Sequence, residues 1–253
     1  MWRALVAVAG RHCTKLSNGD ENLIGLFLDR GANLEALDGN DWTPLRAAIE
    51  YGYEHVVRLF VDEGANIKAM RGYGQTPIHC AAIHGQEGVA LLLVDKRAVF
   101  ERTDAHGDTA LHHAAKAGYG NIVRLLLDKG ANLEVRNNRS CTLWLLTPEF
   151  VRVAAAQILI DRGADMEAAN IGGRTPLLMV MPSKNAESLA MEDMKAAVQL
   201  LLGRGADIDT VDRGGNTPLS LVDSRPESGP VNLLLLAQQY IHTNDDDSRT
   251  ARV

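Results

Sequence analysis

The chain has 253 residues, of which 46% are apolar and 23% charged, a globular balance that excludes a disordered or collagen-like protein. Its 26 lysines and arginines are outnumbered by 32 aspartates and glutamates, and the net charge of −6 gives no overall positive field for nucleic acid or an anionic membrane. No apolar stretch approaches the roughly 18 to 20 residues that a membrane-spanning helix needs.

Three cysteines, Cys13, Cys80 and Cys141, are scattered along the chain without the paired spacing of a zinc site. An odd number of unpaired cysteines favours a reducing compartment over a secreted, disulfide-linked protein. We therefore expect an intracellular protein of the cytoplasm or nucleus.

Short phrases of seven residues, with a glycine in third place, recur along the chain. They read DRGANLE, DEGANIK, DKGANLE, DRGADME and GRGADID, with their glycines at Gly31, Gly64, Gly130, Gly163 and Gly205. These glycines are 33, 66, 33 and 42 residues apart. The phrase DKRAVFE, with Arg97 in the glycine position, divides the step of 66 into two steps of 33. Threonines recur with the same period, at Thr43, Thr76, Thr109, Thr142, Thr175 and Thr217. Two markers in phase predict an array of stacked supersecondary units.

One copy, residues 104–136, shows what each unit contains. Thr109 is a helix N-cap, residues 110–117 form a first helix with small alanines, and residues 121–129 form a leucine-rich second helix. Gly130 suits the left-handed position that commonly follows a helix. A single unit cannot bury its leucines, so neighbouring units are expected to stack and to stabilise one another.

The first helices carry the most specific signal. TPLRAAIEYG at Thr43, TPIHCAAIHG at Thr76 and TALHHAAKAG at Thr109 are each followed by an apolar run and most by Gly-Ala-Asn or Gly-Ala-Asp. This pattern resembles the ankyrin repeat and covers nearly the whole chain. The resemblance implies an all-α protein, an α-solenoid of helix-turn-helix repeats with projecting β-hairpin loops, which binds other proteins and is not an enzyme.

The phase of the markers predicts the domain organisation. Residues 1–37 form an incomplete, capping repeat with helices near 4–9 and 21–30 and a polar loop through Asn18 and Gly19. Six repeats follow at 38–70, 71–103, 104–136, 137–169, 170–211 and 212–241, and residues 242–253 form a disordered polar tail.

Several copies depart from the pattern. Arg97 is expected in left-handed geometry at a cost of about 1 kcal/mol, which softens the junction that follows. In the fourth copy, residues 147–149 look like a fresh helix start. The fifth copy contains nine extra residues near Pro182, and the sixth is interrupted between residues 224 and 230.

We find no phosphate loop, dinucleotide motif or hydrolase signature, so no catalytic, cofactor-binding or metal-binding residue and no small-molecule substrate is expected. Five histidines do cluster in adjacent copies: His79, His84, His106, His112 and His113. A metal enzyme built on them is the weaker interpretation. In the resembling family, the histidine at the positions of His79 and His112 stabilises the turn beside the threonine.

Binding residues are expected where the copies differ and remain exposed. In the resembling family these places are the hairpin loops and the ends of the first helices. Here they hold Asn40, Trp42, Glu50, Tyr51, Met70, Tyr73, Gln75, Ile83, His84, His106, Asp108, Lys116, Arg136, Arg139 and Arg174. Trp42, Tyr51 and Tyr73 are the strongest candidates, because aromatic residues dominate the energy of protein interfaces. The alternative is that Trp42 packs on its neighbouring hairpin and Tyr73 shields a turn.

The sequence thus predicts an interaction module or adaptor that binds an unidentified protein through its hairpin tips and concave face, and binds neither nucleic acid nor membrane. A second possibility is that these repeats are one portion of a larger regulatory or effector protein whose activity lies in another domain.

Overall fold

The computed structural model describes residues 18–70, 72–143, 153–181 and 191–223, which form helices and loops without a β-sheet. The chain divides into two compact units, Met1–Asn132 and Leu133–Val253, and each is described by itself.

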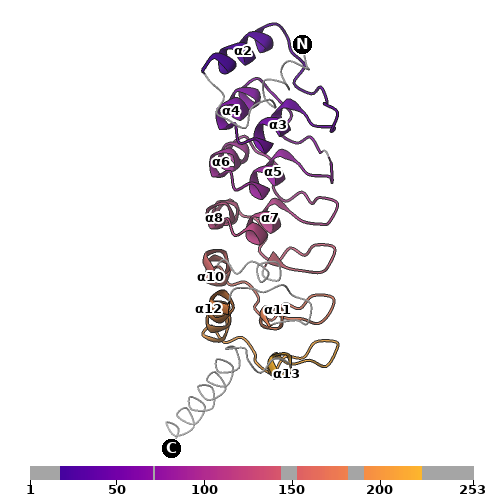
Figure 1. Cartoon of the computed structure of the whole chain (residues 1–253), viewed down its shortest axis with the longest axis vertical. Helices are drawn as coiled ribbons and strands as arrows, with labels where there is room; N and C mark the ends of the chain where they lie inside the picture. Colours follow the sequence, from indigo (N-terminus) through magenta and orange to yellow (C-terminus); the bar gives the residue numbers. More distant parts are fainter. Residues whose placement is uncertain (1–17, 71, 144–152, 182–190, 224–253) are drawn as a thin grey trace, which may run out of the picture. The chain divides into compact units, whose positions relative to one another are not determined.

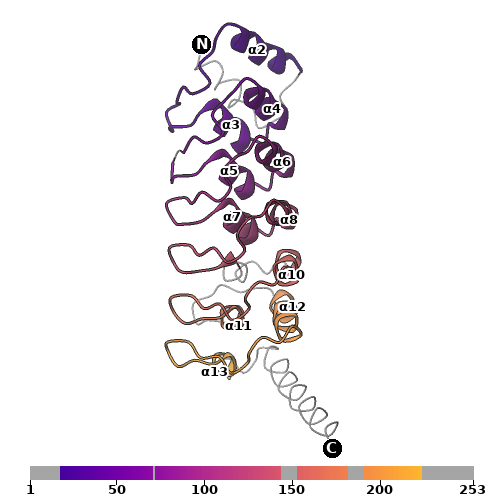
Figure 2. The same ribbon diagram turned by 180° about the vertical axis from the view of Figure 1, so that it is seen from behind.

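The first unit contains helix α2, Asn18–Asp29, and then three helix pairs (Figure 1). The pairs are α3, Pro44–Glu50, with α4, Glu54–Asp62; α5, Pro77–Ile83, with α6, Glu87–Asp95; and α7, Ala110–Ala117, with α8, Gly120–Asp128. In this unit α3, α5 and α7 form one layer, α4, α6 and α8 form a second, and the loops project beyond the first layer (Figure 2). The predicted helix-turn-helix repeats are confirmed.

The first helices start where the threonines predict. Thr43 and Thr109 have extended backbone, and their Oγ1 atoms accept from the N–H groups of Arg46 at 3.3 Å and His112 at 3.4 Å. These bonds satisfy donors that have no partner within the helix. Gly118 ends α7 in left-handed geometry, with φ 74°.

The core of the first unit lies between the two helix layers. Alanine pairs such as Ala47 and Ala48 are buried on the first helices, and Phe60, Leu93 and Leu126 are buried on the second helices. Small side chains on one layer let the larger ones of the other approach closely. The predicted alanine and leucine seam is therefore present, and at about 25 cal/mol per Å² of apolar area it is the main source of stability.

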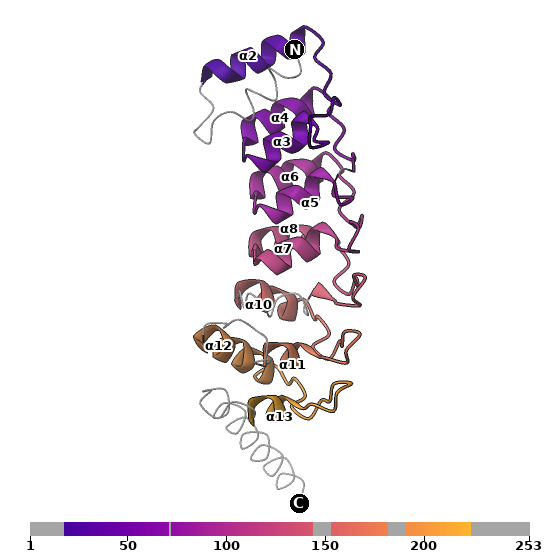
Figure 3. The same cartoon turned by 45° about the vertical axis from the view of Figure 1, so that its right-hand side comes forward.

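The second unit contains α10, Val153–Asp161; α11, Pro176–Val180; α12, Met191–Leu202; and α13, Pro218–Asp223 (Figure 3). Helix α12 packs against both α10 and α11. Helix α11 has only five residues and ends at Val180, and the next residue, Met181, has extended backbone beside the predicted insertion.

Two local expectations have different outcomes. The polar loop predicted through Asn18 and Gly19 is wrong, because α2 already begins at Asn18. The low helix propensity of Asn18 and Gly19 therefore does not exclude them from this helix. Arg97 is left-handed as predicted, with φ 64°. The expected helix at 4–9, the start at 147–149, the insertion near Pro182, the 224–230 interruption and the tail all lie outside the described residues.

Five of the projecting loops in the described residues turn as hairpins held by one side chain. The backbone N–H of Asp104 donates to the carbonyl of Asp108 at 2.9 Å, and Oδ1 of Asp104 accepts from the N–H groups of His106 at 2.8 Å and Asp108 at 3.0 Å. The same arrangement recurs at Asp38, Asn137, Asn170 and Asp212. These five turns are therefore fixed by bonds within the chain itself.

Candidate functional site

In the first unit, the loop tips bring Tyr73 and His106 together. Tyr73 is 69% exposed, and its ring centroid lies 6.0 Å from that of His106. The carbonyl of Tyr73 accepts from the N–H of Ala105 at 2.8 Å, which ties the two successive loops to each other. Met70 is exposed beside Gly74. This tip surface carries apolar and aromatic side chains, and a backbone hydrogen bond joins its two loops.

Trp42 lies half-buried beneath the tips. The guanidinium of Arg46 stands 5.4 Å from its ring centroid, and Nη2 of Arg46 donates to Oε1 of Gln75 at 3.2 Å. The aromatic ring thus stacks on a cation that reaches the following loop. Trp42 and Gln75 have structural contacts in addition to their exposed parts.

The ends of the first helices form a second group of candidates. Nε2 of His84 lies 3.2 Å from Oε2 of Glu50, so these side chains from successive repeats are paired. Tyr51 is 47% exposed, Lys116 is exposed and Ile83 is half-buried. The structure therefore places a histidine–glutamate pair, an aromatic ring and a lysine on the same layer of helices.

The two remaining candidates of the first unit belong to the turns themselves. The N–H of Asn40 donates to Oδ1 of Asp38 at 2.8 Å. The carbonyl of Asp108 lies 3.2 Å from Nε2 of His79. The backbones of Asn40 and Asp108 take part in the hydrogen bonds of their hairpins. The side chain of Asn40 is at the surface.

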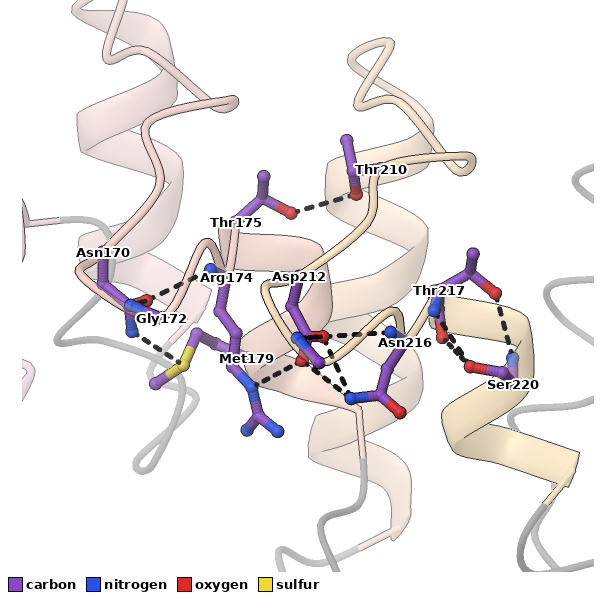
Figure 4. A network of polar contacts seen from close by, with 11 residues as sticks. Asn170, Gly172, Arg174, Thr175, Met179, Thr210, Asp212, Asn216, Thr217 and Ser220 are labelled. Atoms are coloured by element: carbon purple, nitrogen blue, oxygen red, sulfur yellow. Dashed lines mark hydrogen bonds and ion pairs between the residues drawn. The ribbon is translucent and has the colours of Figure 1, made fainter.

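In the second unit, the three candidate arginines lie on two neighbouring loops. Nη1 of Arg136 donates to the carbonyls of Ser140 and Ala169, both at 3.0 Å. Arg139 is exposed. Nε of Arg174 lies 3.2 Å from Oδ2 of Asp212 (Figure 4). Arg136 and Arg174 therefore hold successive loops together as well as carrying charge.

The carboxylate of Asp212 is the centre of a polar network in Figure 4. Oδ1 accepts from the N–H groups of Gly214 at 2.8 Å and Asn216 at 2.9 Å, and Nδ2 of Asn216 lies 2.9 Å from Oδ1 and 3.0 Å from Oδ2. These hydrogen bonds, that from the Asn216 side chain above all, lower the pKa of Asp212. Asp212 stays ionised and fixes the loop before α13.

The two histidines assigned to the turns are structural, as the sequence predicts. Nδ1 of His79 accepts from the N–H of Thr76 at 3.2 Å, and Nδ1 of His112 accepts from the N–H of Thr109 at 3.1 Å. Burial, together with the nearby His113, lowers the pKa of His79 to about 4. His79 is therefore neutral at pH 7.

Asp104, Asp108 and His113 place potential metal-ligating atoms within 4.8 Å of one another. Oδ1 of Asp104 already accepts the two N–H groups of its loop, and Oδ2 lies 2.9 Å from Nε2 of His113. Burial opposes ionisation of Asp104, but the hydrogen bonds from His113 and the backbone outweigh it and lower its pKa. The side chain of Asp104 therefore stabilises its own hairpin through these bonds and contacts His113. The histidines His84 and His106 do not belong to it.

Four exposed residues of the loops were missed by the sequence analysis: Leu37, Ile171, Val211 and Arg213. Leu37 and Val211 immediately precede the aspartate of their loops, and Ile171 and Arg213 immediately follow the asparagine or aspartate. Aligning the copies on that polar residue would have placed all four at the tips.

Comparisons with known proteins agree with this fold. The family described as ankyrin repeats (3 copies) matches residues 12–104 and 70–137. The ankyrin repeat domain of Bcl-3, a member of the IkappaB protein family, is 26% identical, with a TM-score of 0.67 over 86% of this chain and 92% of its own. The ankyrin repeat domain of human ASB11 is 22% identical, with a TM-score of 0.75 over 92% of this chain and 96% of its own. No curated protein sequence matches significantly.

The chain belongs to the ankyrin-repeat family. Ankyrin repeats are generally protein–protein interaction modules, and such domains are typically non-enzymatic. None of the helices in the described residues combines the length and apolarity needed to cross a bilayer.

Proposed function

We propose that this protein is a non-enzymatic interaction module or adaptor, which grips a protein partner with its hairpin tips and the ends of its first helices. The observation that carries the proposal is the exposed Tyr73, whose ring lies near His106 and whose loop is joined by a backbone hydrogen bond to the loop that Asp104 fixes. A large aromatic ring exposed on a preordered loop offers contact area at little entropic cost.

The helix ends extend the same surface. Tyr51 is exposed at the end of α3, and the Glu50 and His84 pair lies at the ends of α3 and α5. A partner that contacts both the tips and these ends would meet apolar rings flanked by charges of both signs, which suits a folded or extended protein surface. The free, buried thiols of Cys80 and Cys141 suit a partner inside the cell, in the cytoplasm or nucleus.

The experiment is a quantitative pull-down from lysate with the parent protein and a Trp42→Ala and Tyr73→Ala double variant. Loss of the parent's specific partners from the variant supports the proposal. Replacing Trp42 also removes its contact with Arg46. The single variant Tyr73→Ala is therefore tested beside the double variant, because Tyr73 is far more exposed.

Leu91→Ala is the matched control, because Leu91 is a similarly exposed apolar residue of α6, in the other helix layer. We expect this variant to retain every partner. A double variant that recovers the same partners as the parent would discard the tip surface.

A further inference from the structure

The loop tips of the two units carry opposite charge. In the first unit the windows 37–42, 70–75 and 103–108 contain four aspartates and one arginine. In the second unit the equivalent windows 136–141, 169–174 and 211–216 contain four arginines and one aspartate. The first set therefore has a net charge of −3 and the second of +3, on a chain whose total is −6.

The arginines of the second unit lie on loops that are joined to one another. Arg136 donates to the carbonyl of Ala169, and the N–H of Arg213 donates to the carbonyl of Gly172 at 2.9 Å. A Cβ atom at Gly173 would lie 3.3 Å from Cγ of Arg213, so the Arg213 side chain runs beside the preceding loop. The three tips thus form one connected surface, here called the arginine tip surface: Arg136, Arg139, Ile171, Arg174, Val211 and Arg213.

Little of this positive charge is neutralised within the described residues. Arg174 is paired with Asp212, whereas Arg136 donates to carbonyl groups and retains its full charge. Arg139 and Arg213 are exposed, and no carboxylate of the described residues is paired with either. Three acids of the same unit, Asp165, Glu167 and Asp207, lie in the segments that follow α10 and α12, where they accept backbone N–H groups.

Two large aliphatic side chains interrupt the charged surface. Ile171 is 59% exposed and Val211 is 57% exposed, each next to the polar residue that fixes its loop. Arginine side chains match carboxylates with paired N–H donors, and aliphatic side chains between them favour apolar neighbours. The surface is complementary to a chain in which acidic and aliphatic residues alternate.

We infer that the arginine tip surface binds an extended, acidic protein segment whose carboxylates meet Arg139 and Arg213 and whose aliphatic residues cover Ile171 and Val211. The inference rests on the proposed function and specifies the chemistry of the partner. Nucleic acid is the less suitable ligand, because these three windows contain no aromatic side chain on which bases stack.

The test is a selection of peptides from a random displayed library on the full chain. We expect enrichment of sequences with two or more acidic residues interleaved with aliphatic ones, and loss of that enrichment with Arg139→Glu and Arg213→Glu combined. For a synthetic peptide of the enriched sequence, this double variant should bind about tenfold or more weakly by fluorescence anisotropy. The neutral pair Arg139→Gln and Arg213→Gln should fall between variant and parent.

Arg102→Glu combined with Arg124→Glu is the matched control, because it changes the net charge equally at two exposed residues of the first unit. It should bind the peptide like the parent. Enrichment of peptides without acidic residues, or unchanged binding by the Arg139 and Arg213 variant, overturns this inference while leaving the proposed function standing. If the parent enriches no peptide, both are overturned for a linear partner. Tighter binding of a single-stranded oligonucleotide than of the peptide would assign the surface to nucleic acid instead.

Discussion

The guanidinium of Arg174 lies 3.2 Å from the buried carboxylate of Asp212, which comes from the following loop of the same unit. The side chain of Asp212 is 4% exposed, and it also fixes its own loop through Gly214 and Asn216. One carboxylate therefore holds a hairpin in shape and joins it to its neighbour.

Replacing Asp212 by alanine should lower the free energy of unfolding by about 1 to 3 kcal/mol, because Gly214, Asn216 and Arg174 lose the acceptor that their N–H groups share. Asp161→Ala is the control, since Asp161 is paired with Arg204 at 3.1 Å but is exposed. That variant should change stability by about 0.5 kcal/mol or less. Urea denaturation measures both, and equal effects would contradict the role given to Asp212.

Arg97→Gly should raise the free energy of unfolding by about 1 kcal/mol, because glycine tolerates the left-handed backbone that an arginine side chain strains. Arg124→Gly, inside α8, should lower it by about the same amount. The comparison is made by urea denaturation. An unchanged or lowered midpoint for Arg97→Gly is incompatible with strain at that junction.

Stability should decrease as the pH falls from 6.5 toward 4, because the pKa of His79 is about 4 in the fold and 6.5 in the unfolded chain. Protonation between these values favours the unfolded chain, so the stability is complete above pH 6.5 and lost on acidification, by up to about 3 kcal/mol. The contribution of Asp104, whose pKa is lowered, is lost only below its ordinary value of 3.8.

His79→Leu separates the contribution of His79 to this pH dependence from that of Asp104. Leucine is the replacement because Leu178 is fully buried at the equivalent helix position. The variant should be less stable than the parent at pH 7 but should lose less stability between pH 6.5 and 4. Denaturation curves collected across this range give the slopes. Parallel slopes for parent and variant would show that His79 is not the group that responds.

Thr109→Val should lower the free energy of unfolding by about 1 kcal/mol, because it removes the hydroxyl beside the N–H of His112 and Nδ1 of that histidine. Thr142→Val should be nearly neutral, since Oγ1 of Thr142 is buried without a hydrogen-bond partner in the described part of the chain. Thermal unfolding of the two variants compares them directly. A larger loss for Thr142→Val would reverse the assignment.

The sequence predicts the helix pairs well, because local residues such as the threonine N-caps mark where the first helices begin. Threonines at Thr43, Thr76 and Thr109 precede the first helices, and the alanines and leucines reveal which layers pack. The left-handed backbone at Arg97 is equally local, since it follows from the glycine that the other copies have there.

The surface was less predictable, because it depends on where side chains from different repeats meet. Position alone indicated that Trp42 and Arg174 lie on loops, but not that one stacks on Arg46 or that the other pairs with Asp212. Ile171 and Arg213 could not be predicted from the positions just before the threonines, because they lie beside the polar residue that fixes each loop.

Crosslinking mass spectrometry from native lysate tests the central claim most directly, because the exposed lysines of the first unit mark different sides. Lys68 lies in a loop and Lys116 near the end of α7, whereas Lys96 and Lys129 lie at the ends of α6 and α8. If the loops and first helices bind the partner, crosslinks to it will form at Lys68 and Lys116. Partner crosslinks confined to Lys96 and Lys129 would contradict that account.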